Sequence, residues 1–282
     1  MNDRGQQERS QAWKPRLLAV ALGGSLAVSA AHATEGDRNW EFEIGIGTAY
    51  APDYSGSKAS KAQLRLWFDG ALHSAEWGTF ALDSGSLTID PELRWNFVDT
   101  PTEGLGPLIG YRPGRNDSGS GFWKLGGGST ALRGLTNVDG AVDVGVQGFA
   151  SPFGLPLFAQ VRSALNGIQG ALVHLGAYAV LPLAAQGELT FLPTATWANA
   201  RQMRAFYGVG PAQSVASGFA AYRPGAGWQN VALETVADWP IAAKWHVVVS
   251  IAYERLLGSA ADSPLVAARN QVSGLLGLVW HR

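Results

Sequence analysis

Apolar and polar residues alternate with period two along most of this chain, and this alternation limits what the chain can fold into. The stretch "SLTIDPELRWNFV" (86–98) is the clearest case, because one face of such a strand is apolar and the other is polar. The apolar face would carry Leu87, Ile89, Leu93, Trp95 and Phe97. The polar face would carry Thr88, Asp90, Glu92, Arg94 and Asn96. A soluble sheet buries the first face, whereas a membrane barrel turns it to lipid.

Weaker or equal alternation recurs elsewhere in the chain. It marks the stretches 41–50, 63–69, 77–83, 105–112, 138–147, 155–165, 171–181, 187–198, 229–238, 245–254 and 271–280. Together with 86–98 these predict an all-β protein of about twelve strands, with a range of roughly 10 to 14. The 36 glycines and 11 tryptophans are typical of strands joined by tight turns.

The lengths of the connections between these stretches indicate a membrane barrel. Long connections are expected at 51–60, 112–137, 199–228 and 257–270, and short ones at 98–104, 151–154 and 240–244. If the first strand rises from the periplasm, all four long connections fall on the outer side. Short periplasmic turns and longer external loops characterise outer-membrane β-barrels. We therefore predict a transmembrane antiparallel β-barrel; the alternative is a large soluble β-sandwich or lipocalin-like barrel in the periplasm.

The N-terminus indicates export. Lys14 and Arg16 precede an apolar run (17–28), and "AHA" (31–33) offers a cleavage site between small residues. This pattern predicts a cleaved signal peptide over 1–33 and a mature barrel over 34–282. Removing the four basic and two acidic residues of 1–33 leaves 17 basic and 20 acidic residues, a net charge of −3. So small a net charge does not indicate nucleic-acid binding, and the absence of cysteine excludes a disulfide framework.

Motifs for catalysis or cofactor binding are scarce. The five histidines have no metal-ligand spacing, and "WKLGGGST" (123–130) lacks the Gly-Lys-Ser/Thr of a phosphate loop. His73 and Ser74 could suggest a hydrolase pair, but neighbours on a strand point to opposite faces. We therefore predict no enzyme activity, no cofactor and no metal.

Charged residues on the polar faces are the remaining candidates for function. We expect the following to face the lumen: Glu41, Glu43, Arg65, Asp69, Asp90, Glu92, Arg94, Asp139, Asp143 and Glu254. They could form an ion-pair network that fills a narrow lumen, which we favour, or a constriction that selects small solutes by charge. Leu87 and Ile89 are expected to face lipid, with Pro91 at a lipid-facing bulge.

Several segments resemble the MipA/OmpV family of outer-membrane proteins. The most specific are Pro52-x-Tyr54-x-Gly56-Ser57 and "LLGSAADSPLV" (256–266), which contains Asp262, Ser263 and Pro264. The resemblance covers nearly all of the mature chain. One departure is the C-terminus, which ends "LVWHR" rather than on an aromatic residue.

The resemblance implies an outer-membrane barrel without established catalytic residues. The family's MltA-interacting member is described as a scaffold that joins a lytic transglycosylase to a murein synthase, and other members are treated as porin-like or adhesive. The resemblance thus implies a scaffold for peptidoglycan-remodelling enzymes, with a channel for small solutes as the alternative. The motif residues named above are expected to fix loop geometry rather than to contact a partner.

Overall fold

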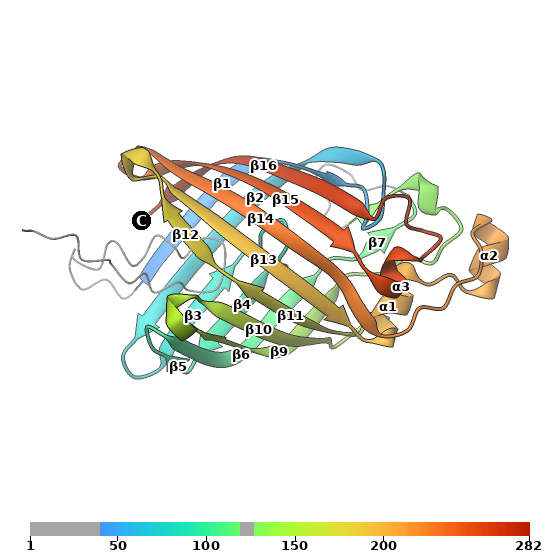
Figure 1. Ribbon diagram of the computed structural model, residues 1–282, viewed down its shortest axis with the longest axis horizontal. Coiled ribbons are helices and arrows are strands. Elements are labelled where there is room, and N and C mark those ends of the chain that lie inside the picture. Colours follow the sequence, from blue (N-terminus) through green and yellow to red (C-terminus); the bar gives the residue numbers. More distant parts are fainter. Residues whose placement is uncertain (1–39, 119–126) are drawn as a thin grey trace, which may run out of the picture.

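The structure, a computed structural model, describes residues 40–118 and 127–282. The predicted signal peptide lies outside these residues. Two sets of strands build the wall of one barrel (Figure 1). The first set is β1 (Trp40–Pro52), β2 (Ser60–Ser74), β3 (Gly78–Asp83), β4 (Glu92–Asn96), β5 (Val98–Asp99), β6 (Glu103–Arg112) and β9 (Ala141–Ala150). The second is β10 (Leu157–Ala164), β11 (Ala171–Ala177), β12 (Ala179–Pro182), β13 (Glu188–Ala198), β14 (Gly227–Ala242), β15 (Trp245–Leu256) and β16 (Asn270–His281).

Antiparallel pairing closes these strands into a ring. β1 pairs with both β2 and β16, and β11 pairs with β13, so no edge is left between the first and last strands. β4 with β5, and β11 with β12, each act as one interrupted strand, because both members of each couple pair with the same neighbour. The result is a 12-stranded barrel, which confirms the predicted fold class and strand number.

Alternation along the strands turns apolar side chains outward. Every second residue of β6, from Glu103 to Tyr111, is exposed and its neighbours are buried. Large apolar residues such as Ile46 (53% exposed) and Leu66 (60%) cover the outer wall. A soluble protein rarely exposes so continuous an apolar surface, so the outer face is suited to lipid. Within the described ranges, no helix combines the length and the apolar character needed to cross a membrane.

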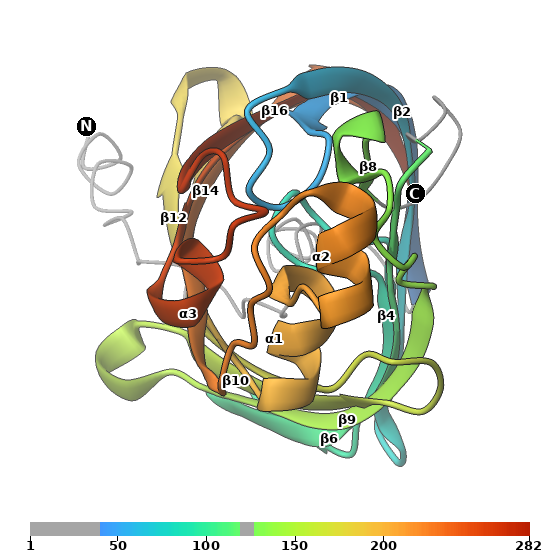
Figure 2. The same ribbon diagram turned by 90° about the vertical axis from the view of Figure 1, so that its right-hand side faces the viewer.

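The two ends of the barrel differ. One end, here called the loop end, carries the long connections and the helices α1 (Ala200–Tyr207), α2 (Pro211–Ser217) and α3 (Gly258–Ala261). Figure 2 shows α1 and α2 lying across the opening of the barrel at this end. The other end, the turn end, holds the start of β1 and the C-terminus, and the connections described there are short turns. The helices were not predicted from sequence, because they are short and lie inside the expected long loops.

Loops at the loop end pack into a cap. Tyr54, Leu132, Leu135, Val209 and Leu265 form one buried cluster, with Phe219 and Tyr222 packed against it. These residues come from four separate connections between strands, so the cluster ties the connections to one another. Short segments β7 (Arg115–Asn116) and β8 (Gly127–Gly128), with the 3₁₀ helix η2 (Thr130–Leu132), belong to the same cap.

The stretch that alternates best in the sequence is the one that departs most from prediction. Only Glu92–Asn96 forms strand β4, and residues 84–91 fold into the lumen instead. Ile89 packs inside the barrel against Phe158, Tyr178 and Leu192, so its predicted lipid-facing position is wrong. Leu87 likewise lies in the inward segment, and its backbone N–H bonds to Glu234 of β14. Pro91 does not occupy a bulge on the wall; it precedes β4 and its carbonyl accepts a hydrogen bond from Tyr111.

Candidate functional site: the lumen and the two ends

An ion-pair network occupies the lumen. The Asp143 carboxylate accepts from Arg112 at 2.7 Å and from Arg162 at 3.2 Å, and Arg162 also reaches Glu92 at 3.3 Å. Arg94 lies 3.7 Å from the other side of Glu92. All five side chains are at most 4% exposed to solvent. Buried charges are tolerated only when they are paired and hydrogen-bonded, and here each cation has an anionic neighbour.

Neutral amides extend this network to the wall and to the cap. Gln160 donates to both oxygens of Glu92, at 2.9 and 3.1 Å. Gln202 of helix α1 accepts from Arg112 at 2.9 Å and from the backbone N–H of Gly170. Helix α1 is therefore connected to the charged centre of the lumen through Arg112.

A second set of contacts holds the inward segment 84–91, which we call the lumen segment. The Glu234 carboxylate accepts from the hydroxyls of Ser86 and Thr88, both at 2.7 Å, and from the backbone N–H groups of Leu87 and Thr88. From β2, Arg65 Nη2 donates to the carbonyl oxygens of Ser84 and Gly85, at 2.9 and 2.6 Å. The lumen segment is thus held by side chains of both β2 and β14, which are separated in the wall by β1, β16 and β15.

The structure places the ten charged candidates in three settings. Buried within the barrel are Asp69, Glu92, Arg94 and Asp143, and partly buried there are Arg65, Asp90 and Glu254. Glu41 and Glu43 lie on β1 near the turn end. Asp139 is exposed in the loop before β9, because that strand begins at Ala141 rather than Val138. Whether any of these residues selects solutes stays a prediction.

Sequence reasoning missed the residues that hold the lumen together most directly. These are Asp83, Arg112, Arg162 and Glu234, all buried. A signal for them existed, since each falls on the polar face of a stretch that was predicted as a strand. Which residues these side chains contact could not be predicted in the same way, because partners such as Glu234 and Ser86 are 148 residues apart in the sequence.

The two motifs that carry the family resemblance meet in the cap. Tyr54 donates from its hydroxyl to the carbonyl of Leu265 at 3.1 Å, and Ser263 donates to the carbonyl of Tyr207 at 2.7 Å. Gly56 has a φ of +99°, and a Cβ there would press against Val266. These contacts favour a role for the motifs in loop geometry.

Burial perturbs ionisable groups in the cap. Removal from water lowers the pKa of the Arg115 guanidinium, and the phenols of Tyr207 and Tyr54 partly offset this effect. The same removal from water raises the pKa of the Tyr54 and Tyr207 hydroxyls. Both tyrosines therefore stay neutral well into alkaline solution, where their hydroxyls continue to hydrogen-bond to neighbouring loops.

His73 and Ser74 do not form a catalytic pair. His73 Nδ1 lies 2.8 Å from the Thr79 hydroxyl and its Nε2 lies 3.6 Å from Glu41, whereas Ser74 Oγ accepts from the backbone N–H groups of Glu76 and Trp77. Among the described residues, no three His, Cys, Asp or Glu side chains are grouped so that they could hold a metal ion.

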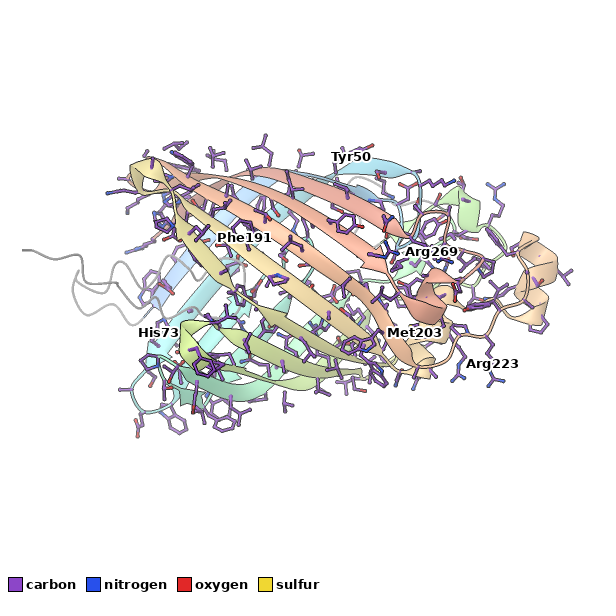
Figure 3. All side chains as sticks on the ribbon, viewed as in Figure 1. Tyr50, His73, Phe191, Met203, Arg223 and Arg269 are labelled. Atoms are coloured by element: carbon purple, nitrogen blue, oxygen red, sulfur yellow. The ribbon has the colours of Figure 1, made fainter. Side chains whose placement is uncertain are left out.

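Charge is distributed unequally between the two ends. In the described ranges, the loop end has nine basic residues: Lys58, Lys61, Arg115, Arg133, Arg201, Arg204, Arg223, Arg255 and Arg269. Its five acidic residues are Asp53, Asp117, Asp139, Glu254 and Asp262. At the turn end, seven acidic residues are described: Glu41, Glu43, Glu76, Asp99, Glu103, Glu188 and Asp238. Only Lys244 and Arg282 are basic there. Figure 3 places Arg223 and Arg269 at the first end and His73 near the second.

Comparison with known families identifies the chain. The sequence model of the family described as "MltA-interacting protein MipA" matches residues 44–282. The chain belongs to the MipA family. This confirms the resemblance found in the two loop motifs. A search of curated protein sequences finds no relative of this member of the MipA family.

Solved structures similar to this MipA-family chain are outer-membrane proteins of low identity. The translocator domain of the autotransporter NalP from Neisseria meningitidis is 10% identical, with 90% of this chain and 92% of that chain covered and a TM-score of 0.40. OmpT of Vibrio cholerae is 7% identical, covering 86% and 96%, with a TM-score of 0.37. OprB of Pseudomonas putida is 13% identical at a TM-score of 0.36; 79% of this chain aligns, but only 59% of OprB. Scores this low carry no argument about function.

The family and the barrel together place the chain in the outer membrane. Short turns face the periplasm in such barrels and long loops face outward. The turn end is therefore periplasmic and the loop end is extracellular. The acidic residues of the turn end consequently face the compartment that contains peptidoglycan.

Proposed function

We propose that this chain is a non-enzymatic scaffold of the outer membrane that holds peptidoglycan-remodelling enzymes at its periplasmic end. The description of its family names an interaction with MltA, and MltA-type lytic transglycosylases and murein synthases are the partners we infer. The observation that carries the proposal is the packed lumen, because a barrel whose interior offers no passage to solutes can act only through its outer surfaces.

The packing of the lumen argues against a role as an open channel. In a water-filled pore, inward side chains are bathed in solvent. Here Arg162, Gln147 and Glu234 are each 1% exposed, and Asp143 is fully buried. The lumen segment and helix α1 add backbone to this packing. Planar-bilayer recording of the purified protein should therefore give no conductance above leak.

The acidic periplasmic end supports the docking role. Seven acidic and two basic residues give this end a net charge of −5 within the described ranges, with the histidines counted as neutral. A surface of one sign raises the association rate of a partner of opposite sign and suppresses partners of like sign. We infer that the partner enzymes present a basic face to it.

The chain would reach this location through the cleaved signal peptide predicted over residues 1–33, which leaves the barrel of 34–282. Mass measurement of the protein extracted from outer membranes tests this step. A mature N-terminus at Thr34 is expected, and retention of residues 1–33 would contradict it.

Co-purification from detergent tests the scaffold itself. The full chain should retain a lytic transglycosylase and a murein synthase, whereas a Glu76→Lys/Glu103→Lys variant should retain less of both. Both carboxylates are exposed; Glu76 lies in a periplasmic turn and Glu103 at the periplasmic end of β6. Asp117→Lys/Asp139→Lys makes the same charge change at the extracellular end and serves as the matched control. The proposal is overturned if the native chain retains neither enzyme. If both variants retain the enzymes equally, the acidic end is not the docking surface.

A further inference from the structure

The outer wall carries a group of cationic and aromatic side chains at the extracellular boundary of its apolar band. Along β15, Val249, Ile251 and Tyr253 point outward and are 40%, 57% and 44% exposed. Arg255 is the next outward residue of the same strand and is also exposed. Two residues of a strand span about 7 Å, or roughly 5 Å along the membrane normal at the usual tilt. The Arg255 guanidinium therefore lies just above an aromatic residue that marks the membrane interface.

Hydrogen bonds organise this group. Asn270 is the cross-strand partner of Arg255 on β16. Its side-chain oxygen accepts from the Tyr253 hydroxyl at 3.0 Å and lies 3.5 Å from Arg255 Nη1. Arg269 precedes Asn270 and pairs with Asp262 at 2.9 Å, with both side chains more than half exposed. Figure 3 shows Arg269 at this end of the wall.

Arg255 has spare capacity for an anion. A guanidinium carries five N–H donors in a planar fork that matches two oxygens of a phosphate. Within the described residues, the Arg255 side chain makes no ion pair, and its one side-chain hydrogen bond is to a neutral amide at the limit of hydrogen-bond length. The Arg269–Asp262 pair is exposed, so a phosphate can compete for Arg269 at low cost.

An apolar strip runs down the wall directly below these cations. Val272, the cross-strand partner of Tyr253, is 60% exposed, and Leu276 further down β16 is also 60% exposed. Between them, a Cβ added at Gly274 would meet no atom closer than 3.8 Å, so the wall has open space there for a hydrocarbon chain. A ligand with a phosphate above and hydrocarbon chains below would contact both parts, whereas a free phosphate would use only the cations.

We propose that Arg255, positioned by Asn270 and Tyr253, and Arg269, paired with Asp262, bind phosphate groups of the phosphorylated glycolipid of the outer leaflet, lipopolysaccharide. The extracellular end as a whole is suited to such a ligand, because it carries nine basic against five acidic residues in the described ranges. The bound lipid would fix the depth of the barrel in the membrane.

Binding of purified lipopolysaccharide to the full-length protein in detergent tests the proposal. Arg255→Gln/Arg269→Gln should weaken binding by about tenfold or more, since each charge-assisted hydrogen bond lost is worth at least that factor. Arg133→Gln/Arg223→Gln removes two exposed extracellular charges away from the wall strands and should change binding by less than about twofold. Heat-modifiable gel migration verifies that every variant is folded.

Two further probes identify the ligand group. Lipopolysaccharide stripped of its phosphates should bind the native chain as weakly as the intact lipid binds the double variant. Inorganic phosphate should compete only at concentrations far above those of the lipid. The proposal is overturned if the two double variants bind alike, if phosphate-free lipid binds as tightly as intact lipid, or if inorganic phosphate binds as tightly as the lipid does.

Discussion

Glu234 is the residue whose removal should release the lumen segment. Its carboxylate accepts hydrogen bonds from the hydroxyls of Ser86, Thr88 and Ser250 and from the backbone N–H groups of Leu87 and Thr88. In Glu234→Ala the hydroxyls can rotate toward other acceptors and the Thr88 N–H keeps the Ser86 hydroxyl as an acceptor, but the Leu87 N–H loses its acceptor. An unsatisfied buried N–H costs about 1–3 kcal/mol, so the conformation with the lumen segment inside the barrel should lose that amount of free energy relative to a released one. The released fraction should rise by a factor between about 5 and about 160.

Thiol labelling measures this fraction, because the chain has no native cysteine. Ile89→Cys places a reporter where the lumen segment packs against the interior cluster, away from the Glu234 contacts. Its labelling rate by a water-soluble thiol reagent should rise on Glu234→Ala, and less on Glu234→Gln, which keeps one acceptor oxygen. Glu254→Ala is the matched control, since that carboxylate binds Asn230 and does not contact the segment. Equal labelling rates with and without Glu234, in barrels that remain heat-modifiable, would refute the reasoning.

Three further outcomes follow from the packing. Asp143→Ala should destabilise the barrel by about 3–5 kcal/mol in urea unfolding from detergent, because it removes the carboxylate paired with the buried Arg112 and leaves the buried Arg162 with Glu92 alone. A loss below about 1 kcal/mol would contradict the network. Gly47→Ala should lower the yield of refolded barrel, since its Cβ would overlap the Leu276 carbonyl, whereas Gly274→Ala has open space and should refold normally. Protease resistance of the cap should be full below about pH 10 and fall as the pH rises beyond it. The raised pKa values keep the Tyr54 and Tyr207 phenols neutral in the folded chain, whereas the same phenols ionise in the unfolded chain, so high pH favours unfolding. A Tyr54→Phe/Tyr207→Phe variant should lack this loss.

The wall of the barrel could be predicted from sequence because the two faces of each strand have different surroundings, lipid on one side and a polar interior on the other. Lipid outside and a polar interior inside impose period-two alternation on every strand, and β6 retains it over its full length. The end of the barrel at which each connection lies could also be predicted, because successive antiparallel strands run in opposite directions and their connections alternate between the two ends. Helices α1 and α2 had no comparable signal, because they are short; α1 packs through Met203 and Tyr207 against the loop ends of β11, β13 and β15 and against α3.

The lumen segment shows where the pattern fails. Its residues alternate as well as those of any strand, yet Gly85 turns the chain inward with a φ of +80° and Pro91 lacks the N–H that a wall strand would use. These two residues break the strand locally, but they do not say where the segment goes. Its position depends on Glu234 and Arg65, which lie far away in the sequence, so alternation alone could not separate a wall strand from an inward one.

The same distinction bears on function. A row of charges on the inward face is compatible with a selective pore and with a packed interior, because both put charged side chains on the same positions of the strands. Burial separates the two: Asp143 and Arg162 contact each other at 3.2 Å and have almost no surface left for water. Charges that neutralise one another in this way cannot also attract a passing solute without first breaking their pairs, at a cost of several kcal/mol. We therefore expect the interior to act as a polar core, which leaves the acidic periplasmic end and the cationic extracellular rim as the surfaces proposed for recognition.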